Sequence, residues 1–88
     1  MSVSAYVLVN AEPARIDALG TEIADLEHVR EVHSVAGSGI ALVARLVVSS
    51  HEDVSDVVVG GISGLDGVID TQTLIAFRSY STAEQDHF

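Results

Sequence analysis

Apolar residues in the first half of the chain change from a strand-like spacing to a helix-like spacing and back. Over residues 3–10 apolar side chains dominate both alternating positions, which indicates a strand buried on two faces. Ile16, Leu19, Ile23 and Leu26 then recur at intervals of three and four residues, which predicts a single apolar stripe along a helix. Residues 30–36 alternate again and predict a second strand.

The same succession is repeated in the second half of the chain. The two halves match without a gap at an offset of 39 residues, most clearly where Leu26-Glu27-His28-Val29 matches Leu65-Asp66-Gly67-Val68. Solenoids need three or more copies, so two copies indicate one pseudo-symmetric domain. The predicted elements are a strand at 3–10, a helix at 14–27, strands at 30–36 and 40–49, a helix at 51–63 and a strand at 68–80.

Two βαβ units joined by a short turn predict an α+β fold with the order βαββαβ. Right-handed crossovers place the strands at 3–10 and 40–49 in the centre of an antiparallel four-stranded sheet, with two helices on one face. This is the ferredoxin-like arrangement. The outer strands carry charged residues such as Glu31 and Asp70, as edge strands do. We expect a single domain over residues 1–80 and a flexible polar tail over 81–88.

The sheet face without helices is predicted to be apolar as well. In the strand at 40–49, Val43 and Val47 lie opposite the core-facing residues, and only Arg45 interrupts the apolar run. The strand at 3–10 is likewise apolar on both faces. Because a monomer seldom exposes an apolar face of this size, we expect two sheets to stack in a homodimer, a dimeric α+β barrel.

Composition and charge exclude several classes of function. The chain of 88 residues has no Cys, which excludes disulfides and thiolate chemistry. Four Arg and no Lys stand against 13 acidic residues, for a net charge of −9, so we expect no direct nucleic-acid binding. No apolar run reaches the roughly 18 residues of a membrane span, and the N-terminus lacks the pattern of a signal peptide. We expect a cytoplasmic domain that does not contact membranes.

Catalytic and metal-binding motifs are absent from the sequence. His33 and Glu31 share one strand face, which suits an acid–base or metal pair, but an ordinary edge-strand pair is the favoured interpretation. His51, Glu52 and Asp53 stand at a helix start, where carboxylates favour the helix dipole, so we interpret them as capping residues. We therefore expect no catalytic residue, no metal site and no cofactor.

Two polar features are candidates for binding a small ligand. The first is a Gly-rich connection between two strands, which consists of Gly37, Ser38, Gly39 and Ile40. It is either a hairpin turn that uses Gly at positive φ or a loop that offers backbone N–H groups, and the sequence leaves both open. The second is the pair Thr71 and Thr73, two residues apart on one strand face. They are either simple strand formers or hydroxyls that orient a small polar ligand.

Several segments together resemble the C-terminal effector domain of Lrp/AsnC-type regulators, also called the RAM domain. They are AYVLVN at 5–10, EVHSVAG at 31–37 and GVIDTQTLIAF at 67–77, within a resemblance over about residues 3–80. The resemblance implies a βαββαβ domain that dimerises through its sheets, assembles into rings of dimers and binds amino-acid effectors between dimers. The helix-turn-helix of the usual regulator has no counterpart here, so the chain resembles a stand-alone effector domain.

The family's effector-binding residues are only partly matched. Its loop after the second strand reads Gly-x-Tyr/Phe-Asp. Gly37 matches the glycine, whereas Gly39 replaces the aromatic residue and Ile40 replaces the Asp. Thr71 and Thr73 match the family's Thr-x-Thr. Because Ile40 cannot pair with a ligand ammonium, we expect weak or no binding of ordinary amino acids and a preference for ligands without a free ammonium.

Three classes of function remain. The first is an effector-binding and oligomerisation domain that senses a small metabolite, an amino acid or a related compound, and modulates transcription by co-assembly with a full-length Lrp/AsnC regulator. The second is a small dimeric α+β-barrel enzyme of the monooxygenase or isomerase type, which needs a convergent polar constellation where only His33 and Glu31 are available. The third is a purely structural oligomerisation domain. We favour the first.

Overall fold

The computed structural model describes residues 2–81, and its elements follow the predicted order. They are β1 (Val3–Ala11), the 3-10 turn η1 (Pro13–Arg15), α1 (Ile16–Ala24), β2 (Val29–Ser34), β3 (Leu42–Val48), α2 (His51–Val57), the π-helical turn η2 (Val58–Ile62) and β4 (Val68–Ala76).

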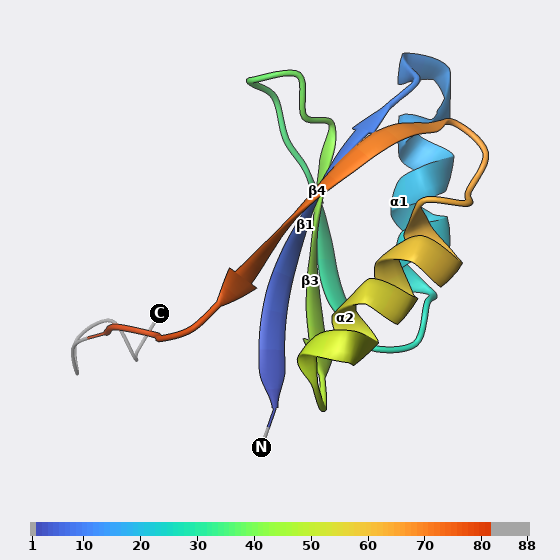
Figure 1. The fold of residues 1–88 in the computed structure, drawn as a ribbon. Helices are drawn as coiled ribbons and strands as arrows, with labels where there is room; N and C mark the ends of the chain where they lie inside the picture. The colour runs from blue at the N-terminus through green and yellow to red at the C-terminus, as the bar shows by residue number, and fades with distance from the viewer. Residues whose placement is uncertain (1, 82–88) are drawn as a thin grey trace.

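The strands form one sheet with the order β2-β3-β1-β4, in which all neighbours are antiparallel. Strands β1 and β3 are central and β2 and β4 are the edges, as predicted. Figure 1 shows both helices on the same side of this sheet. The predicted α+β, ferredoxin-like βαββαβ fold is confirmed.

Strand β4 is shorter than predicted. It ends at Ala76 rather than at residue 80. Its last pair joins Ser4 to Ala76, and because β1 begins at Val3, the sheet offers almost nothing further for Phe77 to pair with. The chain therefore leaves the sheet after Ala76. Of the tail predicted at 81–88, residues 82–88 lie outside the described part of the chain.

The second helix changes its winding half way along. Ser50 caps its start, where the Ser50 hydroxyl accepts a hydrogen bond from the Asp53 amide at 3.4 Å. After Val57 the α-helix predicted to reach residue 63 gives way to η2, which contains Gly60 and Gly61. Adjacent glycines weaken an α-helix, so packing decides the winding there. A Cβ at Gly61 would lie 3.3 Å from Leu26, so this glycine allows close approach to the α1–β2 turn rather than to the sheet.

The hydrophobic core lies between the helices and one face of the sheet. Alternate residues of the central strands point into it, which explains the alternating burial along β1 and β3. The buried side chains are Ala5, Val7, Val9, Ala11, Leu19, Ile23, Leu42, Ala44, Leu46, Val48, Val54, Val58 and Ile62. Among residues 2–81 no polar side chain is buried, so the interior of a single protomer offers no polar site.

The internal repeat is visible as two equivalent turns, one after each helix. His28 and Gly67 occupy the matching positions, both with positive φ, at 76° and 96°. Their carbonyls accept hydrogen bonds from Val47 and Glu12, at 3.0 and 2.9 Å respectively. The first turn is thus joined to the central strand β3, and the second turn is joined to Glu12, the residue just after the central strand β1. Only the second turn has the glycine that a positive φ favours.

Candidate functional site

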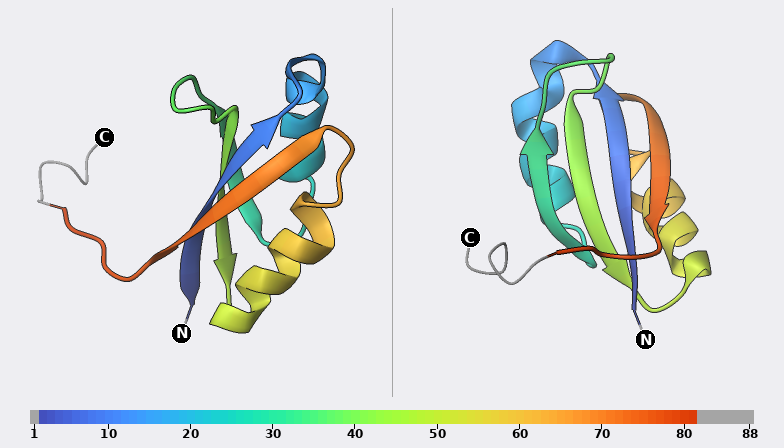
Figure 2. Two further views of the ribbon diagram at one scale, coloured as in Figure 1. Left: turned by 45° about the horizontal axis from the view of Figure 1, so that its top comes forward. Right: turned by 90° about the vertical axis from the view of Figure 1, so that its left-hand side faces the viewer.

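No helix covers the sheet face turned away from α1 and α2, and in the right-hand view of Figure 2 the segment that follows β4 crosses this face near the start of β1. We call this sheet face the open face. Strand register places two rows of side chains across it, Glu31–Arg45–Tyr6–Leu74 and His33–Val43–Leu8–Gln72. The apolar part of the open face consists of Tyr6, Leu8, Val43, Val47 and Leu74. Leu74 is 54% exposed and Tyr6 is 40% exposed. The predicted apolar second face of the central strands is therefore present.

Three charged or titratable side chains form a small network at one side of the open face. Glu31 accepts a hydrogen bond from Arg45 Nε at 2.8 Å, and His33 Nε2 lies 3.2 Å from its other carboxylate oxygen. These two contacts, Arg45 first, hold the pKa of Glu31 below its ordinary value. Both His33 and Glu31 are exposed on the edge strand β2, which agrees with the edge-strand interpretation of this pair.

The Gly-rich connection is a tight hairpin turn between β2 and β3. Gly37, Ser38 and Gly39 have consecutive positive φ angles of 135°, 54° and 75°. The Ile40 amide donates to the Gly37 carbonyl at 3.0 Å and closes the turn. A Cβ at either glycine would meet nothing within 4 Å, so backbone conformation and not space favours glycine there. The hairpin interpretation is confirmed, and the ligand-binding role of these residues stays a prediction.

The two threonines lie on the far edge strand, β4, and face the helices. Thr71 pairs with Val9 and Thr73 pairs with Val7, and both of these valines are buried beneath the helices. The Thr71 hydroxyl also lies 3.4 Å from the hydroxyl of Ser63, which follows η2. The pair is thus placed beside the second helix and not on the open face.

One chain does not bring the hairpin turn and the threonines together. Ala41, just after the turn, donates to the Val9 carbonyl at 2.9 Å, and Thr71 pairs with Val9 from the other side. Strand β1 therefore separates them, with about 10 Å between β3 and β4. The turn also leans toward the side opposite the helices (Figure 1). A small ligand that touches both features needs one of them from another chain.

A hollow of about 450 Å³ lies between the second helix and the turn after α1, away from all the predicted site residues. It is lined by Leu26, Glu27, His28, Asp53, Asp56, Val57, Gly60 and Gly61. One lining residue, His28, stands out in the sequence, because the matching position of the second half of the repeat is Gly67. Within residues 2–81 no three His, Asp or Glu side chains are grouped to hold a metal ion. No helix in that range is long and apolar enough to span a membrane.

An antiparallel sheet with the order βαββαβ and both helices on one face defines a small α+β domain of the ferredoxin-like kind. The model of the Lrp/AsnC ligand binding domain matches residues 4–85. The chain belongs to this family.

Solved structures agree with this assignment. TTHA0845 from Thermus thermophilus is 44% identical, with a TM-score of 0.84, over 91% of this chain and 99% of that one. AsnC of E. coli is 17% identical with a TM-score of 0.81, and the match covers 91% of this chain but 54% of AsnC. A feast or famine regulatory protein from M. tuberculosis, complexed with L-methionine, is 24% identical with a TM-score of 0.76, over 94% and 55% of the two chains. The last two likenesses show the fold alone. No curated protein matches the sequence.

Proposed function

We propose that the chain is an effector-binding and oligomerisation domain, which senses a small metabolite and acts through the assembly that it forms. The observation that carries the proposal is the open face, which is largely apolar over the central strands, with Arg45 and Ser4 among its polar positions, while both helices cover the other side. Apolar patches of this kind mark association sites. A homodimer with two sheets stacked face to face covers it, and a ring of such dimers places effector sites between neighbouring chains.

The proposed effector site combines two parts from neighbouring chains. The turn of Gly37, Ser38, Gly39 and Ile40 supplies backbone N–H groups, which suit a carboxylate. Thr71 and Thr73 supply hydroxyls from the other chain, because one chain holds the two parts apart. The L-methionine bound to the M. tuberculosis protein supports a ligand of amino-acid type. Since Ile40 offers no carboxylate to an ammonium, a keto acid or similar analogue fits better than an amino acid.

Calorimetry with the twenty amino acids and their keto-acid analogues tests the proposed effector site. We expect at least one keto acid to bind, and Thr71→Val or Thr73→Val to weaken it roughly three- to tenfold, as the loss of one hydrogen bond does. Thr21→Val, an exposed threonine on α1, is the matched control and leaves the affinity unchanged. If an amino acid binds tightly and neither Thr71→Val nor Thr73→Val weakens its binding, the effector binds elsewhere and the proposed site is wrong.

The proposal assigns the domain no catalytic step. The pair of His33 and Glu31 is exposed on an edge strand, and the carboxylate is already held by Arg45, so it offers no enclosed place for a substrate. The route to transcription is co-assembly with a full-length Lrp/AsnC regulator, since the net charge of −9 opposes direct contact with DNA.

A further inference from the structure

After Ala76 the chain turns across the beginning of β1, as the right-hand view of Figure 2 shows. Ser2 and Ser4 line a small hollow together with Ala76 and residues 77–79, so the start of this segment lies beside the first residues of β1. Figure 1 shows the segment running away from the sheet on the side opposite the helices. We call residues 77–81 the C-terminal arm. The arm leaves the domain on the side of the open face.

The arm carries two large apolar side chains that its own chain leaves uncovered. Phe77 is 86% exposed and Tyr80 is 82% exposed. They are half of the aromatic residues of the chain, which has two Tyr and two Phe. Aromatic side chains bury about 150–250 Å² each, so the pair brings about 300–500 Å² of surface to an interface. That is a large part of the roughly 800 Å² per partner in a standard protein–protein interface.

Charge favours a second copy of this chain as the partner of the arm. The arm has one arginine, Arg78, and no acidic residue, whereas the whole chain carries a net charge of −9. Arg15 and Arg45 pair with carboxylates of their own chain, whereas Arg30 and Arg78 form no ion pair within residues 2–81. The arm is thus a basic, aromatic segment beside a strongly acidic body, and it can reduce the repulsion between two copies.

We propose that two copies of the chain exchange arms, so that Phe77 and Tyr80 of each copy pack against the other copy. This inference rests on the proposed stacking through the open face. Leu74, on the open face of β4 and three residues before Phe77, is also exposed, so exposed apolar side chains occur both on the open face and on the arm. In a two-fold dimer the contact occurs twice, once through the arm of each copy.

The test compares the dimer dissociation constants of three proteins by sedimentation equilibrium. In the double variant Phe77→Ser, Tyr80→Ser we expect the constant to rise roughly tenfold or more, as the loss of aromatic anchors does. The matched control is Val59→Ser, which removes an exposed apolar side chain from the helix side and leaves the constant unchanged. Both changes lie outside the core, and circular dichroism checks that the variants are folded.

The possible results separate the arm from the stacked face. A double variant that dimerises as tightly as the wild type overturns the arm exchange and leaves the stacking proposal standing. A wild type that is monomeric at micromolar concentration overturns both. Isotope-filtered NMR of a mixture of labelled and unlabelled chains locates the rings directly. Contacts from Phe77 to the unlabelled copy support the exchange, and contacts only within the labelled copy contradict it.

Discussion

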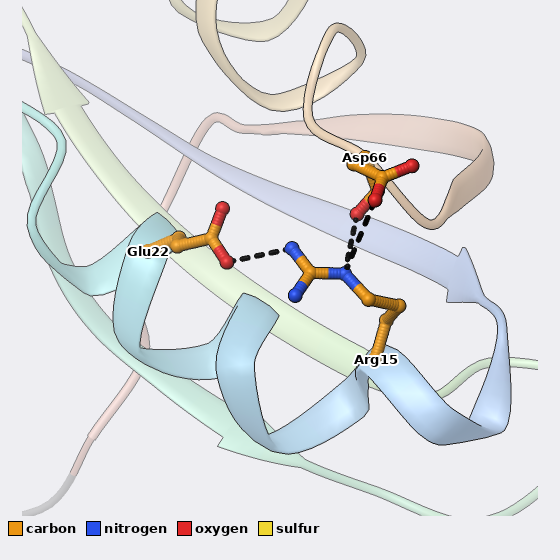
Figure 3. A network of polar contacts seen from close by, with 3 residues as sticks. All are labelled: Arg15, Glu22 and Asp66. Atoms are coloured by element: carbon orange, nitrogen blue, oxygen red, sulfur yellow. Dashed lines mark hydrogen bonds and ion pairs between the residues drawn. The ribbon is translucent and has the colours of Figure 1, made fainter.

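A methyl group added at Gly67 would lie 2.6 Å from the Cβ of Arg15, closer than two non-bonded carbon atoms can approach. The turn before β4 therefore rests directly on the start of the first helix. Arg15 fastens this contact, since its Nε donates to the Asp66 carbonyl at 3.1 Å and its guanidinium binds Glu22 at 2.7 Å (Figure 3). The first βαβ unit is thereby joined to the second at a place 51 residues away in sequence.

Gly67→Ala should destabilise the domain by about 2–4 kcal/mol, because a left-handed alanine and a steric overlap add together. Urea unfolding followed by circular dichroism measures the loss. Gly64→Ala is the matched control, since a Cβ there meets nothing within 4 Å, and we expect a change within about 0.5 kcal/mol. A Gly67→Ala protein as stable as the control contradicts the close contact.

His28→Gly should raise the free energy of unfolding by about 0.5–1 kcal/mol. The histidine holds a φ of 76°, which glycine adopts without steric cost, and this gain exceeds the extra entropy that glycine loses on folding. His28→Ala keeps the unfavourable backbone and should give no gain. Thermal or urea unfolding distinguishes the two, and equal stability of the glycine and alanine variants argues against backbone strain at this turn.

The contacts of Glu31 should make part of the stability depend on pH. Arg45 first and then His33 hold the folded-state pKa of Glu31 below its ordinary value of 4.5. A carboxylate with a depressed folded pKa stabilises the fold above the unfolded pKa, and this contribution is lost as the pH falls through the folded pKa. The free energy of unfolding of the wild type should therefore exceed that of Glu31→Gln at neutral pH, and this difference should disappear below about pH 4.5.

Urea unfolding of both proteins between pH 7 and pH 3 checks the expected loss. In an Arg45→Gln background the substitution Glu31→Gln should cost less stability at pH 7 than it does in the wild type, because the largest cause of the shift is gone. If the difference in free energy of unfolding between wild type and Glu31→Gln stays constant down to pH 3, the ionisation of Glu31 is not its cause.

The protein alone should not shift naked DNA in a mobility assay at physiological salt. With four arginines, no lysine and a net charge of −9, the chain repels the phosphate backbone. We expect a shift only when a full-length Lrp/AsnC regulator is present, with the protein found in the shifted complex. A salt-sensitive shift by the protein alone contradicts the charge argument, and a regulator complex that excludes the protein contradicts co-assembly.

The fold could be predicted from the sequence because the spacing of apolar residues within each segment of the two βαβ halves indicates a helix or a strand. The stripe of Ile16, Leu19, Ile23 and Leu26 and the alternation in β1 and β3 needed no knowledge of distant residues. The end of β4 was not predictable in this way, because apolar residues continue past Ala76 while the partner strand ends. Whether pairing continues depends on where β1 begins, which is a property of the sheet and not of the segment.

The candidate site was less predictable for the same reason. The turn at Gly37 and the hydroxyl pair at Thr71 and Thr73 are recognisable from residue type and spacing alone. Their separation by β1 follows only from the strand order, and their sides of the sheet follow from the register. The contact between Arg15 and Asp66 likewise has no local signal, since it joins the two halves of the repeat.

Sedimentation equilibrium of the wild-type protein at micromolar concentration tests the central claim, association through the open face, most directly. Val43→Asp places a charge at the centre of that face, and Leu74→Asp places one at an edge position that is already exposed in the single chain. Val59→Asp on the helix side is the control. We predict a wild type and control that are dimeric or larger, and Asp variants that are folded but shifted to monomer. A folded, stable wild-type monomer at this concentration contradicts the account.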